Sequence, residues 1–222
     1  KLAGLIGLGG LQGAIGWWMV SSGIGDTDLV SVAPYRLMTH FGLALLILTV
    51  IAWLWLDLGN QDRVAAPPQS ILLARALFGL VFLQMLAGAL VAGLDAGRTY
   101  NDWPLMAGEL IPSHYIQADL GIRSLFEGRA ATQFNHRLLA YLLWGLSLWA
   151  AWRYRNTEAG RPFGVLAMLV SAQALWGIHT LLNAARLPQA LAHQGLGVAV
   201  TLAAVWLVWK VTPARSPEPA QA

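Results

Sequence analysis

The sequence contains no cysteine and few charged residues. Without cysteine the chain can form no disulfide, bind no metal through a thiolate and hold no Fe–S cluster through cysteine. Charged residues make up only 11% of the chain, whereas a soluble globular domain carries roughly 25%. Apolar residues make up 57%, so most of the surface is expected to face lipid rather than water.

The basic residues do not form a nucleic-acid-binding surface either. The formal net charge is only +3, and no cluster of Lys and Arg alternates with aromatic residues. We therefore expect no nucleic-acid partner. The alternating pattern of membrane-barrel strands is also missing, which leaves helices as the structures that could cross a bilayer.

Six apolar segments are each long enough to cross a bilayer as a helix, which takes about 20 residues. The predicted spans are Leu2–Val20, Tyr35–Leu56, Ala74–Leu94, Phe134–Trp152, Phe163–Leu182 and Leu191–Trp209. The expected fold class is therefore an all-α polytopic membrane protein with six transmembrane helices.

Basic residues in the short loops predict the orientation of these spans. Arg63, Arg153 and Arg161 are among those on the side of the two chain ends, and the arginines of the other side are spread over longer loops. The excess in short loops places both ends in the cytoplasm. The long segment Asp95–Thr132 then lies outside, and it is too long to be a mere connection.

A repeat relates the spans to one another. The odd-numbered spans carry Gln-x-x-x-Gly, and the following spans carry a histidine near the outer end. The pairs are Gln12/Gly16 with His40, Gln84/Gly88 with His136, and Gln173/Gly177 with His193. The repeating unit is thus a hairpin with a glutamine on its first helix and a histidine on its second.

Three histidines at equivalent depth can be interpreted in more than one way. Each could rest at the membrane interface, but ionisable residues within spans usually face the bundle interior and mark function. A neutral imidazole is a good axial ligand for haem iron, and two such helices could clamp one porphyrin. Zinc would need a carboxylate or a third histidine close by. His114, in the outer loop, and His179, on a glutamine-bearing helix, fall outside the repeat, and we expect the first to be solvated and the second structural.

Two arginines favour the haem interpretation. Arg36 precedes His40 by one helical turn, so both side chains share a face, and Arg137 directly follows His136. Haem propionates are carboxylates, which an arginine can bind in a bidentate manner. The alternative is that these arginines only fix the topology.

Several motifs resemble those of the haem A synthase family. They are Gln12–Met19, Pro34–His40, Val91–Gly97, Tyr100–Met106, Gln133–Ala140 and Leu191–Gln194. The resemblance extends from residue 2 to about residue 209. It implies an oxidoreductase that converts a methyl group of haem O to a formyl group by successive hydroxylations, giving haem A for terminal oxidase assembly.

The resemblance also implies roles for single residues. His136 and His193 match the ligand pair for a haem b iron, and His40 matches a catalytic histidine that receives substrate haem. Arg36 and Arg137 are candidates for cofactor binding, and Tyr100, Asn101 and Trp103 would cap the pocket. Asp102 departs from the family, which more often has Thr or Ser there, so a hydroxyl role at this position is in doubt.

The family has eight spans in two four-helix halves. The chain begins with Lys1 and has three repeat units, so it resembles the last six spans. The expected organisation is a hairpin of the substrate half (1–57), a cytoplasmic loop (58–73), a complete four-helix half for haem b with outer loop 95–132 (74–210), and a disordered cytoplasmic tail (211–222). We expect this chain alone to be inactive.

The expected location is a bacterial inner membrane or the mitochondrial one. Expected partners are haem O, membrane lipid, a haem O synthase, an electron donor and, in a homo-oligomer, further copies of the chain. The rival functions are a di-haem electron-transfer cytochrome linked to quinone, a non-catalytic haem-binding assembly factor and a transporter. A transporter site would lie near the midplane between broken helices, whereas these histidines lie near one face.

Overall fold

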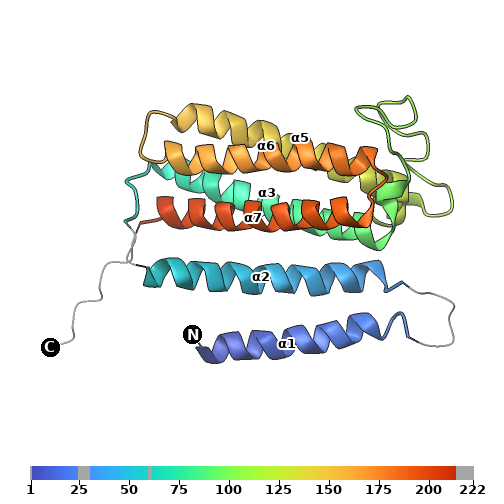
Figure 1. The fold of residues 1–222 in the computed structure, drawn as a ribbon, viewed down its shortest axis with the longest axis horizontal. Coiled ribbons are helices and arrows are strands. Elements are labelled where there is room, and N and C mark those ends of the chain that lie inside the picture. The colour runs from blue at the N-terminus through green and yellow to red at the C-terminus, as the bar shows by residue number, and fades with distance from the viewer. Residues whose placement is uncertain (1, 25–30, 60–61, 214–222) are drawn as a thin grey trace.

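The computed structural model describes residues 2–24, 31–59 and 62–213. Six long helices run alongside one another (Figure 1). They are α1 (Leu2–Val20), α2 (Pro34–Leu58), α3 (Pro68–Gly93), α5 (Arg129–Tyr154), α6 (Gly160–Leu182) and α7 (Leu187–Val211). Three short helices lie between α3 and α5, namely η1 (Ala96–Arg98), η2 (Gly121–Arg123) and α4 (Ser124–Glu127). The all-α fold class is confirmed.

The bounds of the helices agree with the predicted spans at some ends and extend them at others. The first helix has the predicted bounds. Helix α3 begins at Pro68, so the loop predicted at 58–73 is shorter, because Pro67 and Pro68 start the helix before its apolar part. Helix α5 begins at Arg129, within the outer loop predicted at 95–132. The predicted tail has Val211 in α7, and its residues 214–222 lie outside the described residues.

Four of the helices form a bundle, and the other two form a hairpin beside it. Helix α3 packs against α5 and α7, and α6 packs against the same two helices, so α5 and α7 occupy opposite corners of the bundle. Helix α2 packs against α3 and α7, and α1 packs against α2 (Figure 1). No residue of α1 is buried against the rest of the described protein.

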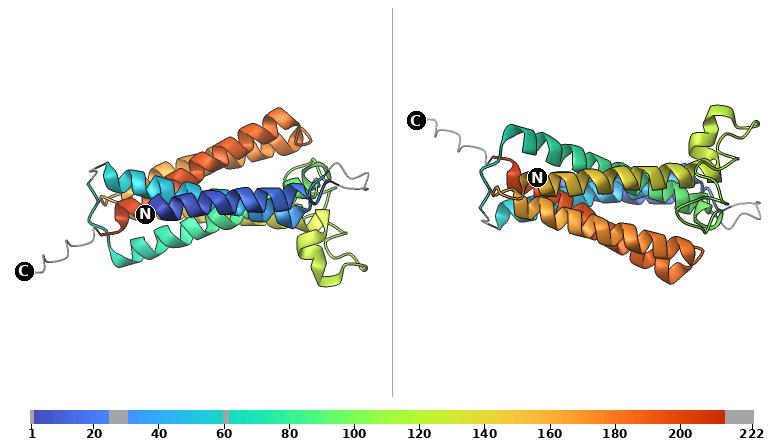
Figure 2. Two further views of the ribbon diagram at one scale, coloured as in Figure 1. Left: turned by 90° about the horizontal axis from the view of Figure 1, so that it is seen from below. Right: turned by 90° about the horizontal axis from the view of Figure 1, so that it is seen from above.

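The bundle is packed most tightly in one half of its length. We call the end that carries residues 94–128 the outer end, and the opposite end the inner end. The largest core cluster joins the first halves of α3 and α6 to the second halves of α5 and α7, and Leu77, Phe163 and Leu207 are almost fully buried within it. The Tyr154 and Phe163 rings stack there with centroids 5.0 Å apart. Towards the outer end the hairpin of α6 and α7 leans away from the other helices (Figure 2).

The inner end also joins the hairpin to the bundle. The Arg63 guanidinium bonds the carboxylate of Asp57 at 2.8 Å and the carbonyl of Thr212 at 2.8 Å. The Trp209 indole N–H donates to the same carboxylate at 2.7 Å. Asp57, at the end of α2, is therefore bonded both to the loop that follows it and to the end of α7.

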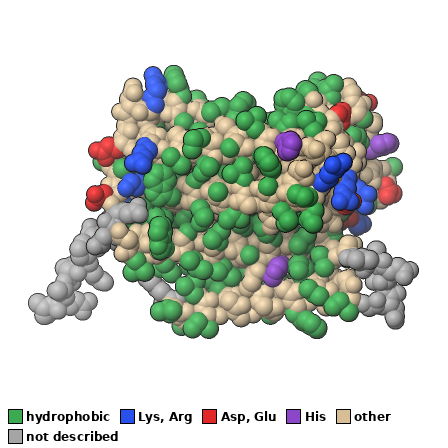
Figure 3. Space-filling view, viewed as in Figure 1, with side chains coloured by type: hydrophobic (Ala, Val, Ile, Leu, Met, Phe, Trp, Pro, Cys, Tyr) green, Lys and Arg blue, Asp and Glu red, His purple; other side chains and the backbone are tan. Residues whose placement is uncertain are grey.

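The surface has the pattern of a membrane protein. Apolar side chains cover the middle of the molecule, and charged side chains gather at its two ends (Figure 3). Five helices, α1, α2, α3, α6 and α7, are long and apolar enough to cross a membrane. Helix α5 has 26 residues but starts with a polar run, and it does not meet that measure. It is packed between α3 and α6, and its role as the sixth span stays a prediction.

Candidate functional site

The three predicted glutamine–histidine pairs are in contact. In each hairpin the glutamine side-chain nitrogen donates to the backbone carbonyl of the histidine on the next helix. The distances are 3.2 Å from Gln12 to His40, 3.2 Å from Gln84 to His136, and 2.9 Å from Gln173 to His193. The repeat found in the sequence is therefore a repeat of contacts between the helices of a hairpin.

The glycine of each motif lies against the same histidine. A Cβ atom built on Gly16 or on Gly177 would lie 2.9 Å from the Cε1 atom of its histidine, and one built on Gly88 would lie 3.2 Å away. Residues four apart share one face of a helix. The glutamine and the glycine thus lie on one face of their helix, and the imidazole ring of the neighbouring helix packs against that face.

His136 and His193 come from opposite corners of the bundle. His136 lies in the second turn of α5 and His193 in the second turn of α7, both at the outer end. One turn beyond His193, a Cβ on Gly197 would meet the sulfur of Met85 at 2.8 Å and the amide of Gln173 at 3.3 Å. Three helices therefore close together immediately below the two histidines.

The residues around these histidines suit a haem iron. The Nδ1 atom of His193 is buried and has no hydrogen-bond partner among the described residues. A neutral imidazole with a free nitrogen can ligate iron. Within the part of the chain that the structure describes, no three side chains of His, Asp or Glu are placed to hold a metal ion directly. The donor set is thus that of two imidazoles at opposite corners, which fits a porphyrin between them better than zinc.

His40 has a different environment. It lies on α2 and faces α1, where it contacts Gln12 and Gly16. Arg36, one turn earlier, donates to the carbonyl of Trp18 at 2.8 Å and stands 4.7 Å above that indole ring. The guanidinium thus binds the carbonyl end of α1, and a role towards a propionate stays a prediction.

Arg137 holds the outer loop. Its guanidinium donates to the backbone carbonyls of Tyr100, Asp102 and Leu105, each at 3.1 Å. Its Nε atom is buried without a partner among the described residues. A role for Arg137 towards a propionate stays a prediction.

The first turns of α5 form a set of anchors that the sequence did not reveal. Gln133 donates to the carbonyl of Tyr100 at 3.0 Å, and Asn135 donates to the carbonyl of Leu125 at 3.1 Å while accepting from the Tyr115 hydroxyl at 2.9 Å. Gln133, Asn135 and Arg137 thus flank His136 along the outer turns of α5. A run of side chains with N–H donors beside a long loop is the signal that could have indicated such anchors.

The predicted cap residues lie at this junction. Asn101 donates to the carbonyls of Gly97 and Leu181, both at 3.0 Å, and so links the loop to the end of α6. The Trp103 indole donates to the Tyr141 hydroxyl at 2.9 Å. A cavity of about 200 Å³ lies under this contact and is lined by Trp103, Phe134 and other mainly apolar side chains.

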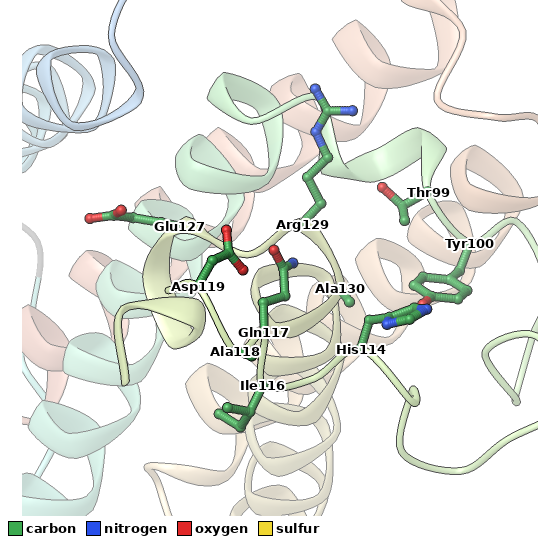
Figure 4. A pocket seen from close by; sticks show the side chains of 10 residues that line it. All are labelled: Thr99, Tyr100, His114, Ile116, Gln117, Ala118, Asp119, Glu127, Arg129 and Ala130. Carbon is green, nitrogen blue, oxygen red and sulfur yellow. The ribbon is translucent and has the colours of Figure 1, made fainter. Parts of the chain in front are cut away.

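A cavity of about 670 Å³ lies in the outer loop. Its lining comes from the loop and from the start of α5, and Figure 4 shows His114, Asp119 and Arg129 around it. His114 is exposed, as predicted. His179 is also exposed on α6, where its ring lies 5.0 Å from that of Trp176 and its carbonyl accepts from Asn183.

The charge at Asp102, where the family more often has a hydroxyl, stabilises a turn. Its carboxylate accepts from the backbone N–H of Gly108 at 3.4 Å. Backbone N–H groups of Ala107 and Gly108 lower the pKa of Asp102 below its ordinary value. The side chain therefore serves the fold of the outer loop.

A second acidic group joins the loop to the hairpin. The Tyr35 hydroxyl, at the start of α2, donates to Glu127 at 3.2 Å, and Arg123 pairs with the same carboxylate at 2.6 Å. The bond from Arg123 lowers the pKa of Glu127. We call these three residues the outer latch.

Comparison with known proteins identifies the family. Residues 1–205 match the family of cytochrome oxidase assembly proteins. The chain belongs to this family. No solved structure matches it.

The relatives of the chain are haem A synthases. One from Hyphomonas neptunium is 72% identical over 210 residues, which are 95% of this chain and 60% of the relative. One from Dinoroseobacter shibae is 46% identical over 88% of this chain and 53% of the relative. One from Paracoccus denitrificans is 46% identical over 84% of this chain and 51% of the relative. The chain thus spans between half and three fifths of the relatives it matches. These bacterial relatives and the apolar helices identify a multi-pass protein of the inner membrane.

Proposed function

We propose that this chain acts as a haem A synthase, oxidising a methyl group of haem O to a formyl group to give haem A for terminal oxidase assembly. The observation that carries the proposal is the 72% identity to a haem A synthase over almost the whole chain. The three Gln/His hairpins support it, because they supply imidazoles to one end of the helices.

In this proposal His136 and His193 hold haem b between α5 and α7. Haem, when bound, supplies the redox chemistry, and the protein supplies orientation and exclusion of side reactions. A haem held by the imidazoles of these two histidines would supply electron-transfer chemistry. The anchored outer loop, through Gln133 and Arg137, would cover it from the outer end.

His40 would receive the substrate haem. With dioxygen as the oxidant, each of the two hydroxylations takes two electrons from the methyl group and two from a donor, places one oxygen atom on the carbon and releases the other as water. The doubly hydroxylated carbon then loses water to give the formyl group, and an electron-transfer site nearby would pass on the electrons of the donor. Arg36 would bind a propionate, and Arg137 would do so through its Nε N–H, which has no partner among the described residues, because an arginine and a carboxylate form charge-assisted hydrogen bonds. A haem O synthase would supply the substrate, and a separate donor would supply electrons. The protein would work in contact with lipid and in a homo-oligomer.

A chimera tests this function. The matching 210 residues of the Hyphomonas relative are replaced by those of this chain, and the membranes are supplied with haem O. We expect extracted haems to include haem A, and His40→Ala in the chimera to abolish it. Gly13→Ala, where a Cβ would have no neighbour within 4 Å, is the control. A folded, haem-containing chimera that makes no haem A while the parent relative does would contradict the proposal.

We also propose that the outer end faces away from the cytoplasm. Since the chain has no cysteine, a single cysteine at the exposed Ser113 is a clean reporter. It should react with an impermeant maleimide in intact spheroplasts. Labelling only after lysis would reverse the orientation.

A further inference from the structure

Two of the three repeated glutamines, Gln12 and Gln84, make a second contact besides the bond to the backbone. The side-chain nitrogen of Gln84 lies 3.2 Å from both ring nitrogens of His136. That of Gln12 lies 3.2 and 3.3 Å from the ring nitrogens of His40. A point at such equal distances cannot lie in the ring plane, because there it would overlap a ring carbon. The amide therefore lies over the face of the imidazole.

This position has a consequence for the ring. A partner that fixes a histidine tautomer lies in the ring plane, in line with one nitrogen. An amide over the face leaves both in-plane nitrogen positions free and restrains the tilt of the ring instead. The amide is itself held, because one of its protons goes to the histidine carbonyl. The side-chain oxygens of Gln12, Gln84 and Gln173 have no hydrogen-bond partner among the described residues.

The glycines restrain the same rings from the edge. The 2.9 Å approach to Cε1 at Gly177 and Gly16 is closer than real Cβ atoms come, so a methyl there would force the ring to turn. At Gly88 the distance is 3.2 Å, and a smaller adjustment would suffice. The rings of His40 and His136 are thus restrained by both the glutamine and the glycine of the facing helix, and the ring of His193 is restrained by Gly177.

We propose that Gln84/Gly88 and Gly177 are positioning residues that set the imidazole planes of His136 and His193, and that Gln12/Gly16 does the same for His40. The proposal rests on the proposed function in one respect, namely that haem binds between His136 and His193. The residues act through the ligands and touch no haem themselves. Partners that orient metal ligands in this way typically change metal affinity on the order of 10–100-fold when removed.

The test uses the full chain with bound haem b and reads the ligand planes directly. The g-values of a low-spin ferric haem depend on the mutual angle of its two axial imidazoles. We expect Gly177→Ala to shift the largest g-value and to weaken haem binding about 10–100-fold, and Gly88→Ala to do so less. Gly164→Ala on α6 and Gly79→Ala on α3 are matched controls, because neither Cβ would have a neighbour within 4 Å.

A second variant keeps the test decisive if an alanine hinders folding. Gln84→Met retains length and removes the amide, so we expect a low-spin haem with a broadened, shifted signal and unchanged thermal unfolding of the apoprotein. Wild-type g-values in both Gly177→Ala and Gln84→Met would overturn the inference. Haem A formation is scored separately. This is done in the chimera with the Hyphomonas relative, which supplies the rest of the protein. Shifted signals with no haem A from the chimera would refute the function alone, and haem A from the chimera with unshifted signals would refute the inference alone.

Discussion

The α1–α2 hairpin and the four-helix bundle contain the same Gln/Gly/His contact in different surroundings. In the bundle, the contact lies above a packed core, and its two histidines come from opposite corners. In the hairpin, α1 has no buried residue and α2 has only Leu45 and Leu56. The contact therefore needs no more than two adjacent helices, whereas a site with two facing imidazoles needs the bundle.

The largest expected difference between the two regions is in haem content. Residues 1–222 expressed alone should bind about one haem per chain, in the bundle, and should form no haem A from haem O. The physical reason is that His40 is contacted by a helix that is otherwise exposed. Haem per chain and chromatography of extracted haems measure both quantities. Two haems per chain, or robust haem A formation, would remove the distinction between the regions.

Stability should also depend on the bundle. The Phe163 side chain is only 1% exposed. Phe163→Ala should lower the free energy of unfolding by about 3–5 kcal/mol, because a cavity remains in the core. Leu11→Ala on α1, at a side chain that is 48% exposed, is the control and should cost far less. Denaturant unfolding in detergent provides the measurement. Equal losses would show that α1 packs as tightly as the core.

Two arginines allow a finer comparison. Arg137→Ala removes three part-buried bonds to loop carbonyls, and each such bond contributes about 0.5–1.5 kcal/mol. Arg36→Ala should have a smaller effect, because its contacts with Trp18 and Ser21 are exposed. Protease cleavage between residues 99 and 110 should accelerate only in Arg137→Ala. Equal cleavage in both variants would show that Arg137 does not hold the loop.

The outer latch should respond to acid. The folded-state pKa of Glu127 lies below its ordinary 4.5, so its contacts with Arg123 and Tyr35 contribute fully above pH 4.5 and are lost as the pH falls through the lower value. Spin labels at Met38 and Ile122 should show a broader distance distribution in acid. In Glu127→Gln the distance distribution should already be broad at neutral pH and should not change in acid. A wild-type distance that stays constant to pH 3 would contradict this role.

The sequence predicted the helices better than it predicted their neighbours. Long apolar runs are sufficient to find spans. Pro34 and Pro188 lie in the first turns of α2 and α7, and α7 begins at Leu187, four residues before the predicted start. The start of α3 at Pro68 was missed because its first turns are less apolar. The start of α5 at Arg129 was missed because polar anchors occupy its outer turns.

The candidate site was predictable where it depends on local spacing. Repetition of Gln, Gly and His along the chain predicted the pairing within each hairpin. Tertiary packing decides that α5 and α7 lie at opposite corners of the bundle. It also decides that Arg137 donates to carbonyls of the outer loop. A single sequence contains no direct signal for that packing.

The ligand pair itself is the central claim, and the absorption and EPR spectra of three single variants test it most directly. The full chain should contain a low-spin haem b with two imidazole ligands. His136→Ala and His193→Ala should each lose the low-spin signal and bind haem more loosely, because one imidazole remains. His40→Ala should keep the wild-type spectrum. If His136→Ala and His193→Ala both retained the low-spin haem, or if His40→Ala lost it, haem would not be held between α5 and α7.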